Sequence, residues 1–541
     1  MKKNSFIKDS FISIAGVVAC KIIGLLYVVP FYAMISTTGG ALYSYAYSIY
    51  ALFLSLSTSG IPAAISKTIS EYDTLGYDKT KIRVFKIGLA IIVALGIIGF
   101  IAMMFFAEPL AYMLIGDMQG GNTIEDIAFV IRVISTALLI VPLLSVTKGY
   151  FQGEKQFKAA SLANVIEQIA RVIFLLIGCY LILKVFKLDE KYAIGIAVLS
   201  ATVGAVISYI YLFIKMKKNK ELFKKNEITL KKEEQTLTTK YLAKQVIFCA
   251  IPFIIIDLLK SAYGMVDALT VVRGMTYLGY NAEISELALS TFTTWGAKLT
   301  MIVISISIGL TISLIPNIAA DNIKGDTKRV NHKINLSIIA LLFITLPMVI
   351  GISFLARPIW NIFYSYNAVS IDLFRIFIFS ACSFSIYSVI VNIGQTLNHT
   401  KQVFITLLSA FILHFVLNIP FMAWFHSMGI PAYHGVSLCT LLTEIGPALY
   451  LLLYLKKKHK LNFEELKSNS FKVLIATISM VVVLYLLSFI YKIDTIGRFE
   501  SLIQVIIYMI VGAGTYFFIS YKTGLLQEIL GDKLKKIGLR K

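Results

Sequence analysis

The stretch "AGVVACKIIGLLYVVPFYAM", residues 15–34, has the length and apolar character of a helix that crosses a bilayer. A lysine, Lys21, stands inside it. At about 1.5 Å per residue, Lys21 lies roughly 16 Å along the helix from Ser10. That depth is too great for its ammonium group to reach an interface easily. We therefore expect Lys21 to face a cavity, a partner or a ligand.

Apolar runs of similar length recur along nearly the whole chain of 541 residues. The chain is 57% hydrophobic and 15% charged, whereas soluble domains carry about 25% charged residues. Its mean hydropathy is +0.79. Counting runs of about 20 residues predicts an all-α polytopic membrane protein with about 14 transmembrane helices.

The net charge of +21 is concentrated in short segments between apolar runs, such as "KMKKNKELFKKNEITLKKEE" (215–234) and "KKKHK" (456–460). Lysine and arginine mark cytoplasmic loops in this way, and no aromatic platform accompanies them to indicate nucleic-acid binding. With fourteen spans the basic loops fall on one side, which predicts that both termini are cytoplasmic. The loop "KVFKLDEKY" (184–192) fits less well, because it would be external despite three lysines.

Two pairs of segments resemble each other at an offset near 250 residues. "GIPAAISKTISEYDTLGYDKTKI" (60–82) echoes "LIPNIAADNIKGDTKRVNHKI" (314–334), and "YFQGEKQF" (150–157) echoes "TLNHTKQV" (396–403). Chance similarity between apolar helices is the alternative. A duplication predicts two six-helix lobes around a central cavity, a common transporter architecture. The expected divisions are an N-lobe (8–216), a basic cytoplasmic linker (217–242), a C-lobe (243–455), two further helices (456–523) and a basic cytoplasmic tail (524–541).

Lys298, in "TTWGAKLTMIVISISIGL", is a second lysine deep in an apolar run. Lys21 and Lys298 would stand in corresponding halves of the chain and could converge on one anionic group. The alternative is that each lysine pairs with a carboxylate inside the membrane and only orders the helix bundle.

Other charges in the spans occur at helical spacing. Glu167 and Arg171 are four residues apart and are expected to form an ion pair. Asp257 and Lys260 are three apart, and Asp267 returns to the same helix face. These groups either neutralise one another within the bundle or line the cavity, where a carboxylate would carry a coupling proton or Na⁺.

Polar groups elsewhere in the spans give weaker signals. Glu444 precedes Gly446 and Pro447, where a local helix break would add polarity to the cavity. Tyrosines crowd "ALYSYAYSIYAL" (41–52), Tyr45 among them, either as an interfacial belt or as a lining that stacks on a sugar.

The chain shows no pattern of an enzyme. It has no phosphate-binding loop of the GxxxxGK[ST] type, and its six histidines and five cysteines lack metal-ligand spacing. We expect a transporter without a cofactor, driven by the membrane potential or by a Na⁺ or H⁺ gradient.

Four segments carry a resemblance to a known family: "GIPAAISKTISEY" (60–72), "KGYFQGEKQF" (148–157), "NVIEQIARV" (164–172) and the segment around Pro316. Together they resemble the polysaccharide-transport branch of the multidrug/oligosaccharidyl-lipid/polysaccharide exporter superfamily. The stage V sporulation protein B-like members, related to MurJ-type lipid II flippases, are the most similar. The resemblance covers residues 8–455 and extends through two further helices.

The resemblance implies a flippase whose two lobes open alternately to each face. In such proteins, cationic residues on the first and eighth helices engage the pyrophosphate of the substrate. Lys21 and Lys298 match these two positions, with lysine in place of arginine. Tyr27 stands near the position of a further arginine, and Ser44 and Tyr45 stand where the family has an acidic residue. These departures bear on which lipid-linked saccharide is the cargo. Contact of Tyr27 and Tyr45 with a sugar is the alternative to their belonging to an interfacial belt.

The function predicted from the sequence is the transfer of a polyprenyl-pyrophosphate-linked saccharide, lipid II in particular, across a bacterial plasma membrane. Membrane lipids and envelope synthases are the expected partners, with no nucleic acid, and a monomer would suffice. The alternatives are a cation-coupled multidrug exporter of the same superfamily and a non-transporting scaffold for envelope synthesis.

Overall fold

The computed structural model describes residues 19–58, 60–154, 156–218, 237–494 and 497–530. Every regular element within these ranges is helical. The chain divides into two compact units: unit 1 is Met1–Arg273 with Asn281–Glu286, and unit 2 is Gly274–Tyr280 with Leu287–Lys541. Most of the predicted basic linker and of the basic tail lies outside the described residues.

Eleven helices of the described ranges, 25 to 30 residues long, are apolar enough to cross a membrane. In two of them, Asp78–Phe105 and Arg498–Lys522, only 22% of the most apolar window is buried inside the protein. Apolar side chains that face outward over such a length require lipid around them. The prediction of an all-α polytopic membrane protein is confirmed.

Unit 1 begins with an apolar helix over Ala19–Met34, which a turn interrupts at Tyr27. Its elements are α2 (Val28–Met34), α3 (Thr37–Thr58), α4 (Gly60–Leu75), α5 (Asp78–Phe105), α6 (Ala107–Ile115), α7 (Ile124–Ser135), α8 (Ala137–Gly153), α9 (Phe157–Tyr180), the π-helix η1 (Leu181–Val185), α10 (Glu190–Lys218), α13 (Thr239–Tyr277) up to Arg273 and α14 (Ala282–Ser290) up to Glu286.

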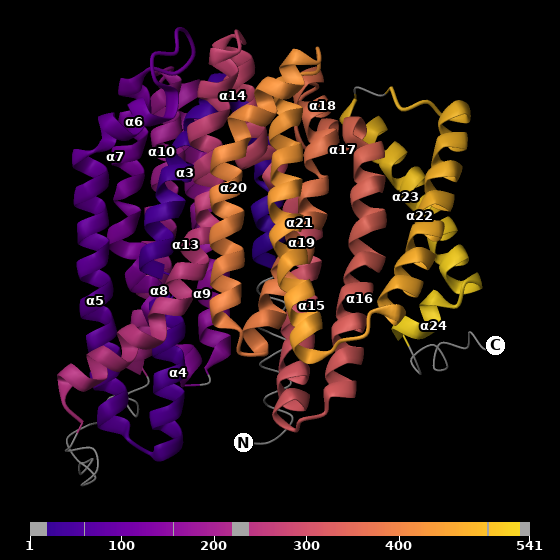
Figure 1. The fold of residues 1–541 in the computed structure, drawn as a ribbon. Coiled ribbons are helices and arrows are strands. Elements are labelled where there is room, and N and C mark those ends of the chain that lie inside the picture. Colours follow the sequence, from indigo (N-terminus) through magenta and orange to yellow (C-terminus); the bar gives the residue numbers. More distant parts are fainter. Residues whose placement is uncertain (1–18, 59, 155, 219–236, 495–496, 531–541) are drawn as a thin grey trace. The chain divides into compact units, whose positions relative to one another are not determined.

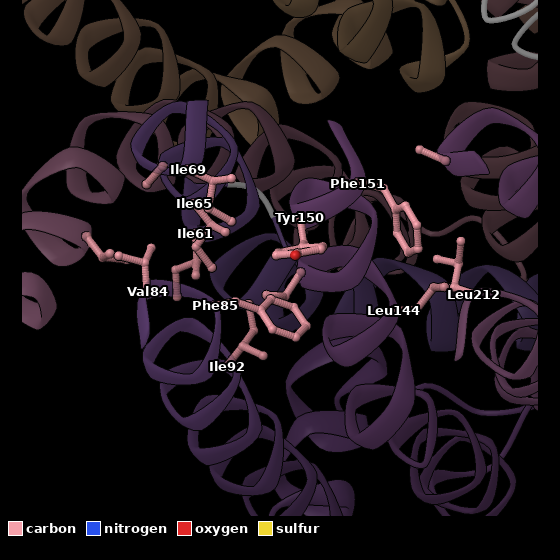
Figure 2. Close-up of a cluster of buried hydrophobic side chains, with 14 of the residues drawn as sticks. Ile61, Ile65, Ile69, Val84, Phe85, Ile92, Leu144, Tyr150, Phe151 and Leu212 are labelled. Atoms are coloured by element: carbon pink, nitrogen blue, oxygen red, sulfur yellow. The ribbon is translucent and has the colours of Figure 1, made fainter. Parts of the chain in front are cut away.

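The core of unit 1 forms where α4, α5 and α8 pack together. Figure 2 shows Ile61, Ile65 and Ile69 of α4 near Val84 of α5, with Tyr150 of α8 close by. Small residues allow this approach: a Cβ on Gly149 would stand 2.7 Å from the carbonyl oxygen of Pro62. Two of the segments that carry the family resemblance therefore pack directly on each other.

Unit 2 contains the remainder of the chain. Its elements are η2 (Thr291–Trp295, a π-helix), α15 (Gly296–Ile323), α16 (Thr327–Phe354), α17 (Ala356–Phe363), α18 (Ala368–Phe377), α19 (Phe379–Thr396), α20 (Thr400–Ser427), α21 (Ala432–His459), α22 (Glu464–Ile490), α23 (Arg498–Lys522) and α24 (Leu525–Leu530).

Packing within unit 2 parallels that of unit 1. The echoed segments lie on α15 and at the end of α19, and these two helices pack together as α4 and α8 do. In yellow in Figure 1, α22 and α23 lie side by side, with α24 across one end of the pair. The helix break predicted after Glu444 is wrong, because α21 continues with Pro447 inside it.

Candidate functional site

The charged interior of unit 1 is built on α9, which carries the segment "NVIEQIARV". The carboxylate of Glu167 accepts a hydrogen bond from the ammonium of Lys148 on α8, at 2.6 Å. Both side chains are mostly withdrawn from solvent, with 16% of Lys148 and 26% of Glu167 exposed. The predicted Glu167–Arg171 pair is therefore wrong: α8 supplies a cation for Glu167, and Arg171 is occupied by another helix.

Arg171 points into the tyrosine cluster of α3. Its guanidinium donates to the hydroxyls of Tyr47 and Tyr43, the latter at 3.4 Å, and lies 5.3 Å from the centroid of the Tyr47 ring. The two tyrosine rings are themselves 4.5 Å apart. Neutral hydroxyls and ring faces stabilise a guanidinium without cancelling its charge. Its Nε is buried, and no described residue forms a hydrogen bond with it.

The helix that carries Lys21 packs against the same face of α9. A Cβ on Gly24 would stand 3.3 Å from the side-chain nitrogen of Gln168. Cys20, the neighbour of Lys21, is within electrostatic range of both Glu167 and Lys148. Lys21 itself is exposed.

Lys21, Lys148 and Arg171 thus belong to one region of unit 1, where the described contacts pair Lys148 with Glu167. Arg171 is held there by neutral tyrosines. A cation held in this way inside a membrane protein suits an anionic ligand.

The two tyrosines predicted to contact a sugar are buried. The hydroxyl of Tyr27 lies 3.5 Å from that of Tyr43, and 6% of Tyr27 is exposed. Tyr45 is fully buried against Glu286. Neither ring is presented to a ligand in this conformation, and their sugar contact stays a prediction.

Glu286 is a buried carboxylate that the sequence reasoning missed. It accepts hydrogen bonds from the backbone N–H of Asn122 at 3.0 Å and from the Asn122 side-chain amide at 2.8 Å. Only 1% of Glu286 is exposed. Gly121, with φ +72°, gives it room, since a Cβ there would stand 2.9 Å from the carboxyl group. In the sequence, an acidic residue at the start of a helix is hard to distinguish from a loop residue. The hydrophobic pattern therefore did not indicate that Glu286 is buried.

Lys298 lies in unit 2, three residues after the π-helix η2. Its ammonium is 5.9 Å from the centroid of the Trp295 ring, within cation–π range. The carbonyl of Trp295 accepts a hydrogen bond from the hydroxyl of Tyr364 at 2.8 Å. Single π-helical turns within α-helices are frequent at functional sites, and this one directly precedes the turn that carries Lys298.

The remaining predicted residues are distributed over three helix segments. The side chains of Asp257 and Lys260, on α13, lie outside the described residues. Asp267 is half-buried further along α13, and Glu444 of α21 is buried and accepts a hydrogen bond from the hydroxyl of Ser383. The structure does not test a coupling role for any of them.

The fold and the charged side chains on its spans define a polytopic helical membrane protein. A family model described as "Polysaccharide biosynthesis protein" matches residues 6–279, which nearly coincide with unit 1. A second model, described as "MatE", matches residues 252–419, mostly in unit 2.

Relatives of known name agree with these matches. The lipid II flippase MurJ of Bacillus subtilis is 30% identical, and the match covers 98% of each chain. Stage V sporulation protein B of the same organism is 29% identical over 44% of each chain. The chain belongs to the polysaccharide biosynthesis protein family, with MurJ as a full-length relative, and the resemblance inferred from the sequence is confirmed.

The fold agrees as well. A structure of "Lipid II flippase MurJ, inward closed conformation" superimposes with a TM-score of 0.61 at 19% identity, covering 94% of this chain and 99% of that one. At this identity the likeness establishes the fold alone.

Proposed function

We propose that the protein is a flippase that moves lipid II, or a closely related polyprenyl-pyrophosphate-linked saccharide, from the inner to the outer leaflet. The observation that carries the proposal is the match to MurJ of Bacillus subtilis along nearly the full length of both chains. The interior of unit 1 supports it, because Arg171 keeps its charge among neutral tyrosines and a cation suits a pyrophosphate.

Lys21 and Lys298 are the proposed pyrophosphate ligands. Lysine binds phosphate as a point charge, whereas arginine would form a bidentate pair. A point charge holds the group with less geometric demand, which suits cargo that must also be released. Tyr27 and Tyr45 would contact the sugar only in a conformation that opens the α3 cluster.

The proposal includes the finer architecture expected from the sequence. It comprises fourteen transmembrane helices, two six-helix lobes around a central cavity, two C-terminal helices and both termini in the cytoplasm of a bacterium. Alternating access of the lobes would be driven by the membrane potential or by a coupled Na⁺ or H⁺, with Asp257 or Asp267 as its carrier. A monomer would suffice, with envelope synthases as partners.

The test is surface exposure of lipid II in cells depleted of their own flippase. We expect the wild-type chain to restore exposure and a Lys21→Ala/Lys298→Ala double variant to fail despite correct insertion. A Lys21→Arg/Lys298→Arg variant should retain transport, because it keeps both charges. Lys467→Ala is a matched control, since this lysine is exposed near the start of α22 and the proposal gives it no role.

Two results would contradict the proposal. Failure of the inserted wild-type chain would mean that the cargo is another lipid-linked saccharide or none. Full restoration by the double alanine variant would mean that the lysines are structural.

A cation-coupled multidrug exporter is the second candidate, favoured by the match of residues 252–419 to the MatE model. It predicts export of organic cations that depends on an internal carboxylate and no effect on lipid II exposure. Asp267→Asn in a drug-accumulation assay separates the two functions.

A further inference from the structure

A second cationic site lies at one end of unit 2, apart from Lys298. A pocket of about 550 Å³ opens between the end of α16, the α17–α18 segment and the end of α22. Three of its lining residues are basic: Arg357, Arg375 and Lys492. Among the described residues that line it, none is acidic. Its volume falls within the ordinary range for small-ligand sites.

Arg357 is built into the wall of this pocket. Its guanidinium donates to the backbone carbonyl of Asp494 at 2.7 Å and lies 5.2 Å from the centroid of the Tyr366 ring. Its Nε is buried and finds no hydrogen-bond partner among the described residues. A carbonyl and a ring face hold the group in place without cancelling its charge.

The location of the three cations is unusual for a membrane protein of this orientation. α16 begins at Thr327, within a basic segment (321–333) that the positive-inside rule assigns to the cytoplasm, and ends beside the pocket at Phe354. In the orientation of the proposed function, on which this inference rests, the pocket is therefore at the outer face. Basic residues are depleted there, so a cluster of three requires a reason other than topology.

An apolar stripe leads from the pocket along α22. Ile478, Val482, Tyr485 and Phe489 follow at helical spacing and are 61%, 51%, 57% and 66% exposed. Lys492 follows two residues after the end of α22 and lines the pocket. The stripe is roughly 16 Å long, close to the ~15 Å depth of one leaflet of the hydrocarbon core.

We propose that this pocket binds the phosphate of an anionic phospholipid in the outer leaflet, with an acyl chain along the α22 stripe. The cations supply charge-assisted hydrogen bonds to the phosphate, and the stripe supplies apolar contact. The stripe is the reason for choosing a lipid over a free phosphate, which would make no use of it. One leaflet of depth matches a phospholipid acyl chain better than the much longer polyprenyl chain.

The test is native mass spectrometry of the full-length chain released from vesicles of equal parts phosphatidylglycerol and phosphatidylcholine. We expect wild type to retain phosphatidylglycerol in preference to phosphatidylcholine. The Arg375→Gln/Lys492→Gln double variant should retain it at least about tenfold less, since each charged hydrogen bond contributes ~1.5 kcal/mol or more. The described contacts of these two residues use only their backbone carbonyls, so the variant should fold.

Arg498→Gln is the matched control, because Arg498 is exposed at the start of α23 and does not line the pocket. It should retain the lipid like wild type. Equal retention by wild type and the double variant, or no preference for phosphatidylglycerol, would overturn the proposal. Displacement of the lipid by inorganic phosphate alone would assign the pocket to free phosphate, and stronger retention of added lipid II would assign it to the cargo.

This measurement is made on purified protein and does not depend on transport. If the chain fails in the lipid II assay but retains phosphatidylglycerol at this pocket, the proposed function is refuted and the lipid site stands. If it restores lipid II exposure but retains no phosphatidylglycerol, only the lipid site is refuted.

Discussion

The Lys148–Glu167 pair gives the sharpest test of how unit 1 holds its charges. At 2.6 Å the Coulomb attraction is about 6 kcal/mol for an effective dielectric constant near 20. Partial exposure and the loss of hydration oppose this attraction, which leaves a coupling energy of about 2 kcal/mol. Removing one partner should be more harmful than removing both, because it leaves a partly buried charge unpaired.

The perturbation is a double-mutant cycle of Lys148→Met, Glu167→Gln and Lys148→Met/Glu167→Gln. The assay is the thermal unfolding of each purified variant in the same detergent. We expect Lys148→Met to lower the free energy of unfolding by about 2 kcal/mol, and the double variant to recover most of that loss. If the two single effects simply add in the double variant, Lys148 and Glu167 are not coupled and the assigned pairing is refuted.

The other predictions concern packing and pH. Gly149→Ala should destabilise the protein by about 1–3 kcal/mol, because its Cβ would stand 2.7 Å from the Pro62 carbonyl oxygen, whereas Gly446→Ala, with open space around it, should not; equal thermal stability of the two variants would contradict this packing. Burial and Lys458 lower the pKa of His399, whose Nε2 lies 2.8 Å from that of His459. The folded protein therefore favours neutral His399, and the stability this gives is complete above the unfolded pKa near 6.5 and is lost as the pH falls through the lower folded pKa. Melting temperatures should drop on acidification, and they should drop less in His399→Gln. Identical pH profiles of the two proteins would count against the burial of His399.

The fold was predictable because its signals are local. Apolar runs define spans within about 20 residues, and helix propensity needs no distant partner. The glycines of "KGYFQGEKQF" and the proline of "GIPAAISKTISEY" were visible as motifs, although their mutual packing was not. The offset of the repeat matches α4 with α15 and α8 with α19. In the structure α15 packs on α19 as α4 packs on α8.

The partners of the charged residues were not predictable, because tertiary contacts decide them. Glu167 pairs with Lys148, 19 residues away in the sequence, and not with Arg171, which is four residues away. Arg171 forms a hydrogen bond with Tyr47, 124 residues away. Glu286 forms a hydrogen bond with Asn122, 164 residues away. Helical spacing indicates which pairs can meet, but it contains no information about a better partner on a neighbouring helix.

The way these charges are satisfied bears on the proposed transport. Glu167 neutralises one cation of unit 1, while tyrosines surround Arg171 with hydroxyls and ring faces that carry no net charge. The guanidinium is thereby stabilised in a poorly solvated place without losing its field. A carboxylate in place of its tyrosine partners would also stabilise Arg171, but it would cancel the positive charge that attracts an anion. We infer that the tyrosine cluster of α3 preserves positive charge beside Lys21, where cargo bearing a pyrophosphate would need it.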